Sequence, residues 1–207
     1  FAKDVEEKTG FVSKTINLGG GFGIYYSEED NPIALKDFVT RMISDLEAKK
    51  EEFGLAVEKI NIEPGRSIVA NSGTTLYTVG GVKDTYSGKK YIFVDGGMTD
   101  NIRPALYQAK YEGVIANRFN DEKNLLATVA GKCCESGDVL IHDSDFANAQ
   151  DGDILAIAST GAYNYSMSSN YNRIGRPAVV FVKEGKAQLV VKRETFEDLV
   201  KNDLELE

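Results

Sequence analysis

Beyond about residue 72 the sequence becomes a succession of short β-branched, aromatic and aliphatic runs separated by Gly, Asp and Asn. Runs of this length and composition predict β-strands, and the residues between them predict turns. We expect these strands at residues 75–79, 91–94, 125–129, 154–157, 178–182 and 188–191. Thr195 is a candidate cap for a terminal helix with Phe196, Leu199 and Val200 on its inner face. Such strand spacing indicates an antiparallel sandwich or barrel.

The first third of the chain has a different pattern. A strand expected at residues 15–18 leads into glycines, and another expected at residues 59–62 leads into Glu63. Between them, apolar residues recur at three- and four-residue steps, which predicts a helix. Asn31 can cap this helix, Pro32 suits its first turn, and Gly54 is a natural end. Strand, helix and strand in this order predict a βαβ unit.

We therefore divide the chain into an α/β segment, residues 1–74, and an all-β domain, residues 75–207. A lone βαβ unit leaves parallel strand edges and an apolar helix face uncovered, so we expect preceding sequence to supply the rest of a barrel. Phe1 is not an initiator methionine, and no basic or apolar leader follows it. We accordingly expect the chain to begin inside a longer protein.

Composition argues against several classes of partner. The chain has 32 acidic and 24 basic residues, a net charge of -8, and no cluster of Lys and Arg that would follow a nucleic-acid backbone. Its apolar runs are far shorter than the ~20 residues of a membrane span. Cys133 and Cys134 are adjacent, which disfavours a disulfide and favours reduced thiols in the cytoplasm. His142 is the only histidine, so a metal site has little support.

Two motifs follow the strands of the α/β segment. Gly19, Gly20 and Gly21 can let the backbone approach an anion and direct its N–H groups inward, which suggests a phosphate site; the alternative is a tight turn without a ligand. The sequence Glu63-Pro64-Gly65-Arg66 ends the second strand. Its carboxylate could pair with a protonated ring nitrogen and its guanidinium with an anion, or the two could form a surface ion pair.

Three further motifs lie in the β-domain. If Pro104 opens a helical turn, Arg103 and Tyr107 share a face and could bind one carboxylate, although an ordinary loop remains the alternative. Cys134 follows a predicted strand in the polar turn Cys133–Asp138, where a thiol could act as an acid or a nucleophile. Tyr163 follows Gly161-Ala162 and places a phenol at the start of a possible helix, where anions are favoured.

The order of these motifs is more specific than any one of them. GGGFG, EPGRS, DGGM with RPALY, CCESGD and GAY together resemble the bacterial diaminopimelate decarboxylases, which are fold-type III enzymes dependent on pyridoxal 5'-phosphate. The resemblance covers nearly all 207 residues and about the second half of the family's chain. It implies the carboxy-terminal part of an alanine-racemase-like TIM barrel, followed by a β-barrel or sandwich domain.

The resemblance also implies roles for individual residues. The cofactor phosphate would lie against the glycine turn, near Gly65 and Arg66, and Glu63 would face the pyridine nitrogen. Cys134 would be the proton donor that completes the reaction. Substrate would contact Arg66, Arg103, Tyr107, Glu135 and Tyr163, the last of which would also touch the cofactor. A carbanion left by loss of carbon dioxide needs an acid, and a thiol can supply a proton and be reloaded from solvent.

The implied activity is decarboxylation of meso-diaminopimelate to L-lysine by a homodimer with shared active sites. The family's Schiff-base lysine and ring-stacking histidine have no counterpart here, so we expect the isolated chain to be inactive. A related basic amino-acid or carboxyspermidine decarboxylase is the alternative among enzymes, and a non-catalytic homologue is the alternative outside them. Arg103 favours diaminopimelate, because a substrate with one simple amine at its far end has no use for a second cation.

Overall fold

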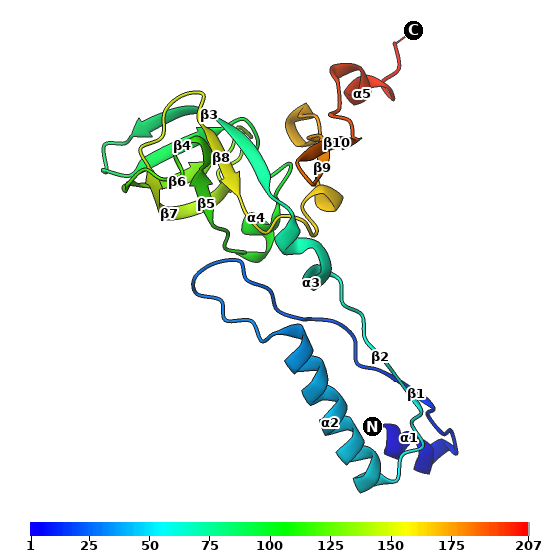
Figure 1. Ribbon diagram of the computed structural model, residues 1–207. Coiled ribbons are helices and arrows are strands. Elements are labelled where there is room, and N and C mark those ends of the chain that lie inside the picture. The colour runs from blue at the N-terminus through cyan, green and yellow to red at the C-terminus, as the bar shows by residue number, and fades with distance from the viewer. Residues whose placement is uncertain (207) are drawn as a thin grey trace. The chain divides into compact units, whose positions relative to one another are not determined.

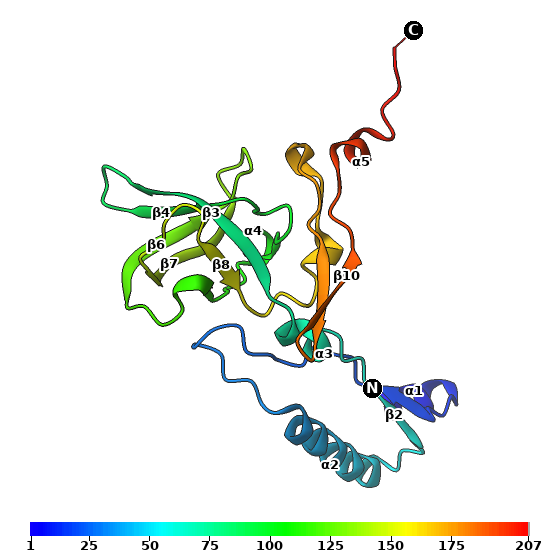
Figure 2. The same cartoon turned by 45° about the horizontal axis from the view of Figure 1, so that its top comes forward.

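The computed structural model describes residues 1–206, which form two compact units. The first unit is Phe1–Val69, and the second runs from Ala70 to the end of the described residues. The boundary predicted between residues 74 and 75 falls at the first residue of strand β3, Thr75–Asp84. Figures 1 and 2 show the course of the chain in each unit.

The first unit contains the predicted βαβ arrangement. Strands β1 and β2 pair in parallel, with Thr15 opposite Lys59 and Asn17 opposite Asn61, and the long helix α2 connects them. Its elements are α1 (Ala2–Thr9), β1 (Thr15–Asn17), α2 (Leu35–Phe53), β2 (Lys59–Asn61) and α3 (Arg66–Val69). Because parallel strands end at the same edge, the turns that follow β1 and β2 are brought together.

Helix α2 ends as predicted but begins later. Gly54 adopts the left-handed conformation with φ of 61° and closes the helix through a hydrogen bond to the Lys50 carbonyl. The helix starts at Leu35, so Asn31 and Pro32 do not form its cap and first turn. Ala34 is extended, with φ of -55° and ψ of 134°, and this conformation interrupts the helical hydrogen-bond ladder. The prediction of the first turn was therefore wrong.

The second unit is built on six strands that curl into a near-closed barrel. Their order is β5-β8-β3-β4-β6-β7, and the terminal strands β5 and β7 also lie close to one another. The pair β4 and β6 is parallel, which corrects the prediction of an antiparallel barrel at this one strand pair. A long connection containing a helix and a further strand separates β4 from β6, and such a crossover permits parallel pairing. The strands are β3, β4 (Lys90–Val94), β5 (Gly113–Ile115), β6 (Lys123–Ala130), β7 (Val139–Ala147) and β8 (Ile154–Ile157).

Alternate residues of these strands fill the barrel interior. Ile92, Val129, Leu155 and Ile157 are completely or almost completely buried. Strands β5 and β7 are not among the predicted runs, β7 because its exposed face carries polar residues such as His142. Short one-turn helices and α4 (Arg103–Tyr107) occupy the connections; the others are η1 (Ala70–Ser72), η2 (Ala116–Arg118), η3 (Tyr165–Met167) and η4 (Tyr171–Arg173).

The chain ends in a hairpin and a short helix. Strands β9 (Val179–Lys183) and β10 (Lys186–Val191) pair antiparallel, as their apolar runs predict. Helix α5 (Phe196–Val200) has the predicted Thr195 cap, completed by Asp198. The expected inner face is wrong, because Phe196 is 84% exposed and Val200 is 51% exposed in this five-residue helix. Helices among residues 1–206 are too short or too polar to cross a bilayer.

Candidate active site

The glycine turn after β1 has a backbone that side chains would not permit. Gly19 and Gly21 have φ of 73° and 82°, in the left-handed region that favours glycine. Gly20 has a different constraint, since a Cβ on it would lie 2.5 Å from the carbonyl oxygen of Glu63. Each of the three glycines is thus required by the local geometry, and the turn stays free of side chains.

Asn17 connects this turn to the Glu63 turn and was not predicted as a site residue. Its Oδ1 accepts a hydrogen bond from the Gly19 N–H at 2.8 Å, and its Nδ2 donates to Glu63 Oε1 at 2.6 Å. The Glu63 N–H in turn donates to the Gly19 carbonyl at 2.7 Å. The available signal was an Asn two residues before a glycine at a strand end, which is typical of a side chain folded back onto its own turn.

Glu63 and Arg66 have separate partners. Glu63 is exposed and bonds Asn17, whereas the half-buried Arg66 places its guanidinium 5.7 Å from the Tyr26 ring centroid. Gly65 accepts a hydrogen bond from the Ile68 N–H and so starts helix α3. This arrangement does not favour the alternative of a simple surface ion pair, and it leaves a carboxylate and a cation at adjacent turns.

In the second unit, Arg103 is enclosed by two phenols. Its guanidinium carbon lies 5.3 Å from the Tyr107 ring centroid and 5.0 Å from the Tyr163 ring centroid. Arg103 is only 9% exposed, whereas both tyrosines are exposed. Its Nε is buried and has no hydrogen-bond partner among the described residues. Two aromatic faces stabilise the cation without neutralising it, so its N–H groups remain suited to a carboxylate.

A buried amide pair connects the segments that carry Arg103 and Tyr163. Asn101 is 1% exposed and Asn164 is 5% exposed. With its amide oriented to satisfy its neighbours, Asn164 Nδ2 donates to the Ala162 carbonyl at 3.0 Å, and its Oδ1 accepts from Asn101 Nδ2 at 3.2 Å. Tyr163 itself has φ of 72°, an uncommon conformation for a non-glycine residue. The pair was not predicted, because its two members lie far apart in the sequence.

The two thiols lie in the turn between β6 and β7, and both are free. Cys133 is half-buried and Cys134 is exposed. Burial, followed by the nearby Asp138 charge, raises the pKa of Cys133 to about 11. The Cys134 N–H donates to Asn172 Oδ1 at 2.7 Å. Of the two cysteines, Cys134 is therefore the one presented to solvent.

Glu135 follows in the same turn and is exposed. Its Oε1 accepts hydrogen bonds from the Gly137 N–H at 3.3 Å and from Ser136 Oγ at 3.4 Å. The structure therefore groups Arg103, Tyr107 and Tyr163 in one cluster and places Cys134 and Glu135 together on a separate turn. Contact between the two groups is not needed for the predicted roles, because the resemblance assigns the thiol turn to a shared site.

Comparison with known proteins identifies the family. The model described as "Pyridoxal-dependent decarboxylase, C-terminal sheet domain" matches residues 13–161. The chain belongs to this family. A diaminopimelate decarboxylase from Bacillus subtilis is 56% identical over 194 residues, which are 94% of this chain and 44% of that protein. The fold class predicted from the sequence is thereby confirmed.

Solved structures of the family agree. The diaminopimelate decarboxylase from M. jannaschii, in complex with L-lysine, matches with a TM-score of 0.89 and 33% identity, covering 100% of this chain and 46% of that one. The Helicobacter pylori enzyme, also complexed with L-lysine, matches with a TM-score of 0.81 and 32% identity, covering 96% of this chain and 46% of that one. The chain thus spans about half the length of these relatives.

Proposed function

We propose that this chain is the part of a pyridoxal-phosphate-dependent decarboxylase that converts meso-diaminopimelate to L-lysine and carbon dioxide. The observation that carries the proposal is the buried Arg103 between two exposed phenols. A cation that is held by aromatic rings and has no carboxylate partner among residues 1–206 is suited to a substrate that brings its own carboxylate. Relatives named diaminopimelate decarboxylase, 56% and 54% identical to this chain, support the same substrate.

The first unit has the features needed to hold pyridoxal 5'-phosphate. The side-chain-free turn at Gly19, Gly20 and Gly21 fits a phosphate, since a Cβ at Gly20 would collide with the Glu63 carbonyl. Gly65 and Arg66 would complete the anion site. Glu63, oriented by Asn17, would bind the protonated ring nitrogen. When bound, the cofactor accepts the electron pair left on the α-carbon as carbon dioxide departs.

The second unit supplies substrate recognition. Arg103 would bind the carboxylate at the far end of diaminopimelate, with Tyr107 and Tyr163 fixing the direction of the guanidinium. Glu135 would bind the far amine. Arg66 and Tyr163 would also contact substrate, and Tyr163 would contact the cofactor. A substrate that ends in a zwitterion uses both a cationic and an anionic group, which separates it from ornithine or lysine.

Cys134 would complete the reaction as the acid. Its Sγ gives a proton to the α-carbon after the carbon–carbon bond to the departing carboxylate has broken, and it regains a proton from solvent. The exposed position of Cys134 supports that exchange. We also propose a homodimer in which the thiol turn of one protomer serves the site of its partner. Two free thiols support a cytoplasmic location.

The test is a chimera in which this chain replaces the matching segment of the Bacillus subtilis relative. Purified chimera should release carbon dioxide from meso-diaminopimelate and form L-lysine when pyridoxal phosphate is present. Ornithine, lysine and carboxyspermidine serve as competing substrates. Preferential turnover of any of these three would refute the assignment of diaminopimelate, and a folded chimera inactive on all four would refute the enzymatic function.

A further inference from the structure

Asp138 connects two turns of the second unit. Its Oδ1 accepts the Met98 N–H at 2.6 Å, and its Oδ2 accepts the Cys133 N–H at 2.7 Å. The residue is 3% exposed. One carboxylate therefore satisfies a backbone donor in each turn, and these donors are separated by many residues in the sequence. A buried carboxylate with two charge-assisted hydrogen bonds is strongly localised.

Glycines surround this carboxylate because no side chain fits beside it. A Cβ on Gly97 would lie 2.5 Å from Asp138 Oδ2, and a Cβ on Gly131 would collide with the same oxygen. The turns are also joined directly, since the Lys132 N–H donates to the Gly96 carbonyl at 3.0 Å. The carboxylate thus occupies a closely fitted space, and it leaves little freedom for the two turns to shift.

Each turn leads to a residue of the candidate active site. The turn that contains Met98 precedes Arg103, and the turn that contains Cys133 carries Cys134. A second contact holds the thiol turn from its other side, where Asn172 Oδ1 accepts the Cys134 N–H. Asn172 has φ of 54°, which Asn tolerates better than most residues.

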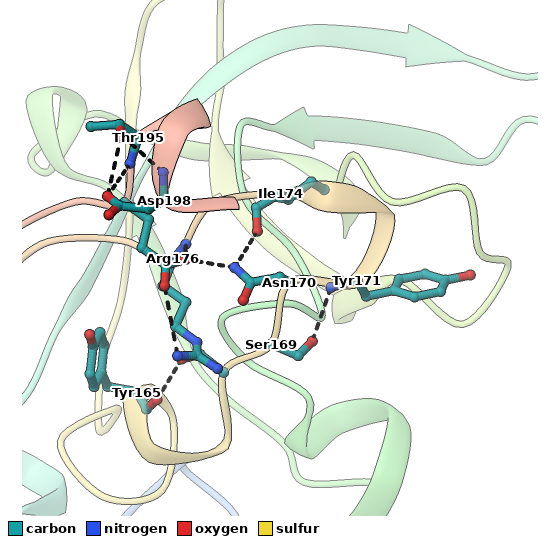
Figure 3. A network of polar contacts seen from close by, with 10 residues as sticks. Tyr165, Ser169, Asn170, Tyr171, Ile174, Arg176, Thr195 and Asp198 are labelled. Carbon is teal, nitrogen blue, oxygen red and sulfur yellow. Dashed lines mark hydrogen bonds and ion pairs between the residues drawn. The ribbon is translucent and has the colours of Figure 1, made fainter. Parts of the chain in front are cut away.

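The segment that carries Asn172 is itself held in place. Asn170 Nδ2 donates to the Ile174 carbonyl at 3.1 Å and to Glu194 Oε2 at 2.6 Å. Glu194 Oε2 also accepts the Arg176 N–H at 2.8 Å. Figure 3 shows this network around Asn170 and Arg176. Two hydrogen bonds therefore hold the backbone of the thiol turn, one from the Cys133 N–H to Asp138 and one from the Cys134 N–H to Asn172.

We propose that Asp138 is a positioning residue for decarboxylation, which holds the Cys134 turn in place on the barrel by tying it to the turn at Met98. The inference rests on the proposed function for its catalytic consequence. Asp138 acts through the backbone of Cys133 and takes no proton itself. Displacement of a reacting group by about 1 Å can cost on the order of 100-fold in rate, so loss of this anchor should act on turnover.

The test variant is Asp138→Asn, with Asp153→Asn as its matched control. The amide of Asn keeps one acceptor oxygen but replaces the other with an NH2 donor, which would face one of the two backbone N–H groups without accepting from it. Asp153 is 5% exposed in the same unit and accepts from Asn117, Arg118 and the Gln150 N–H, away from the thiol turn. The two substitutions thus remove comparable buried carboxylates, and only one of them contacts the turn of Cys134.

Two readouts separate positioning from general destabilisation. In the purified chain, alkylation of each cysteine by iodoacetamide is followed by peptide mass at pH 8. Burial and then the Asp138 charge raise the pKa of the Cys133 thiol, so a variant that removes this charge and loosens the turn should raise its alkylation by on the order of 10-fold. In the chimera, Asp138→Asn should lower kcat by on the order of 100-fold, with a smaller change in KM. Asp153→Asn should do neither.

Unchanged Cys133 alkylation, or an equal loss of kcat in both variants, would overturn the proposal. If Asp138→Asn does not fold, Asn172→Gly replaces it, because glycine keeps the left-handed backbone and removes the second anchor of Cys134. That variant should lower kcat, and wild-type turnover would also count against the inference. If the unsubstituted chimera has no activity, the proposed function fails, while the alkylation arm still decides whether Asp138 holds the turn.

Discussion

Replacement of Arg103 by methionine tests substrate recognition most directly. Methionine keeps an unbranched side chain between the Tyr107 and Tyr163 rings, and it removes the guanidinium. Loss of one partner from a desolvated charge pair costs ~2–5 kcal/mol. Because Arg103 is only 9% exposed, this range applies better than the ~0–1 kcal/mol of a surface pair. The expected loss in kcat/KM for diaminopimelate is therefore roughly 30- to 5000-fold.

The assay compares diaminopimelate with lysine as substrates of the chimera, by carbon dioxide release. Lysine has no carboxylate at its far end, so any turnover of lysine should change only through packing, by roughly a few-fold. Each of the two cation–π contacts contributes about 0.5–2 kcal/mol to holding the Arg103 side chain. Their loss lowers the stability of the enzyme itself, so it affects the turnover of both substrates equally. The ratio of the two kcat/KM values isolates the carboxylate contact.

Lys89→Met is the matched control. Lys89 lies 5.6 Å from the Tyr91 ring centroid in the same unit and also forms an ion pair with Asp143. Its replacement removes a cation from an aromatic ring away from the candidate site, so the substrate ratio should stay at the wild-type value. Equal losses for diaminopimelate and lysine in the Arg103 variant would refute the recognition argument.

Three further predictions follow from the structure. Gly20→Ala places a methyl group against the Glu63 carbonyl oxygen and should weaken pyridoxal phosphate binding by about 10-fold or more when the cofactor is titrated into the chimera and its absorbance followed, whereas Gly23→Ala should not. Cys134→Ala should lower kcat strongly with cofactor binding nearly intact, and Cys133→Ala should have little effect; the reverse result would show that the wrong thiol was assigned. Burial acts to raise the pKa of Asp153, but the hydrogen bonds from Arg118, Asn117 and the Gln150 N–H hold that pKa below its ordinary value. The ionised Asp153 therefore stabilises the fold at pH 7, and this stabilisation is lost as the pH falls through the lowered pKa. In the Asp153→Asn variant, the free energy of unfolding measured by urea denaturation should therefore fall less between pH 7 and pH 3 than in the wild type. An equal fall in both proteins would contradict the stabilising role of the ionised Asp153.

The predictable part of the fold is the part encoded by neighbouring residues. Runs of β-branched residues located most of the strands, and Thr195 with Asp198 encodes a capping box within four residues. Strand β7 was missed because it is buried on one side and polar on the other in an irregular pattern. The beginning of α2 was wrong because Asn31 and Pro32 are compatible with a helix start, while the extended Ala34 depends on the fold around it.

The same distinction holds for the candidate site. Residues with evident chemistry, such as Arg103 and Cys134, could be singled out by type and motif. The residues that hold them could not, because their hydrogen bonds join distant positions: Asn17 to Glu63 over 46 residues, Met98 to Asp138 over 40, and Cys134 to Asn172 over 38. Asn and Asp are common in turns, so each of them was equally consistent with a purely local role.

These distant contacts also explain how two adjacent cysteines acquire different properties. The Cys133 N–H is bound by the buried Asp138 and its thiol is half-buried, with burial and that carboxylate raising its pKa to about 11. Cys133 therefore stays protonated near neutral pH and is less exposed than its neighbour. The Cys134 N–H is held by Asn172, and its thiol is exposed. A proton donor must be held in place and able to regain its proton, and the anchored backbone and exposed thiol of Cys134 are the reason that we propose it rather than Cys133 for this role.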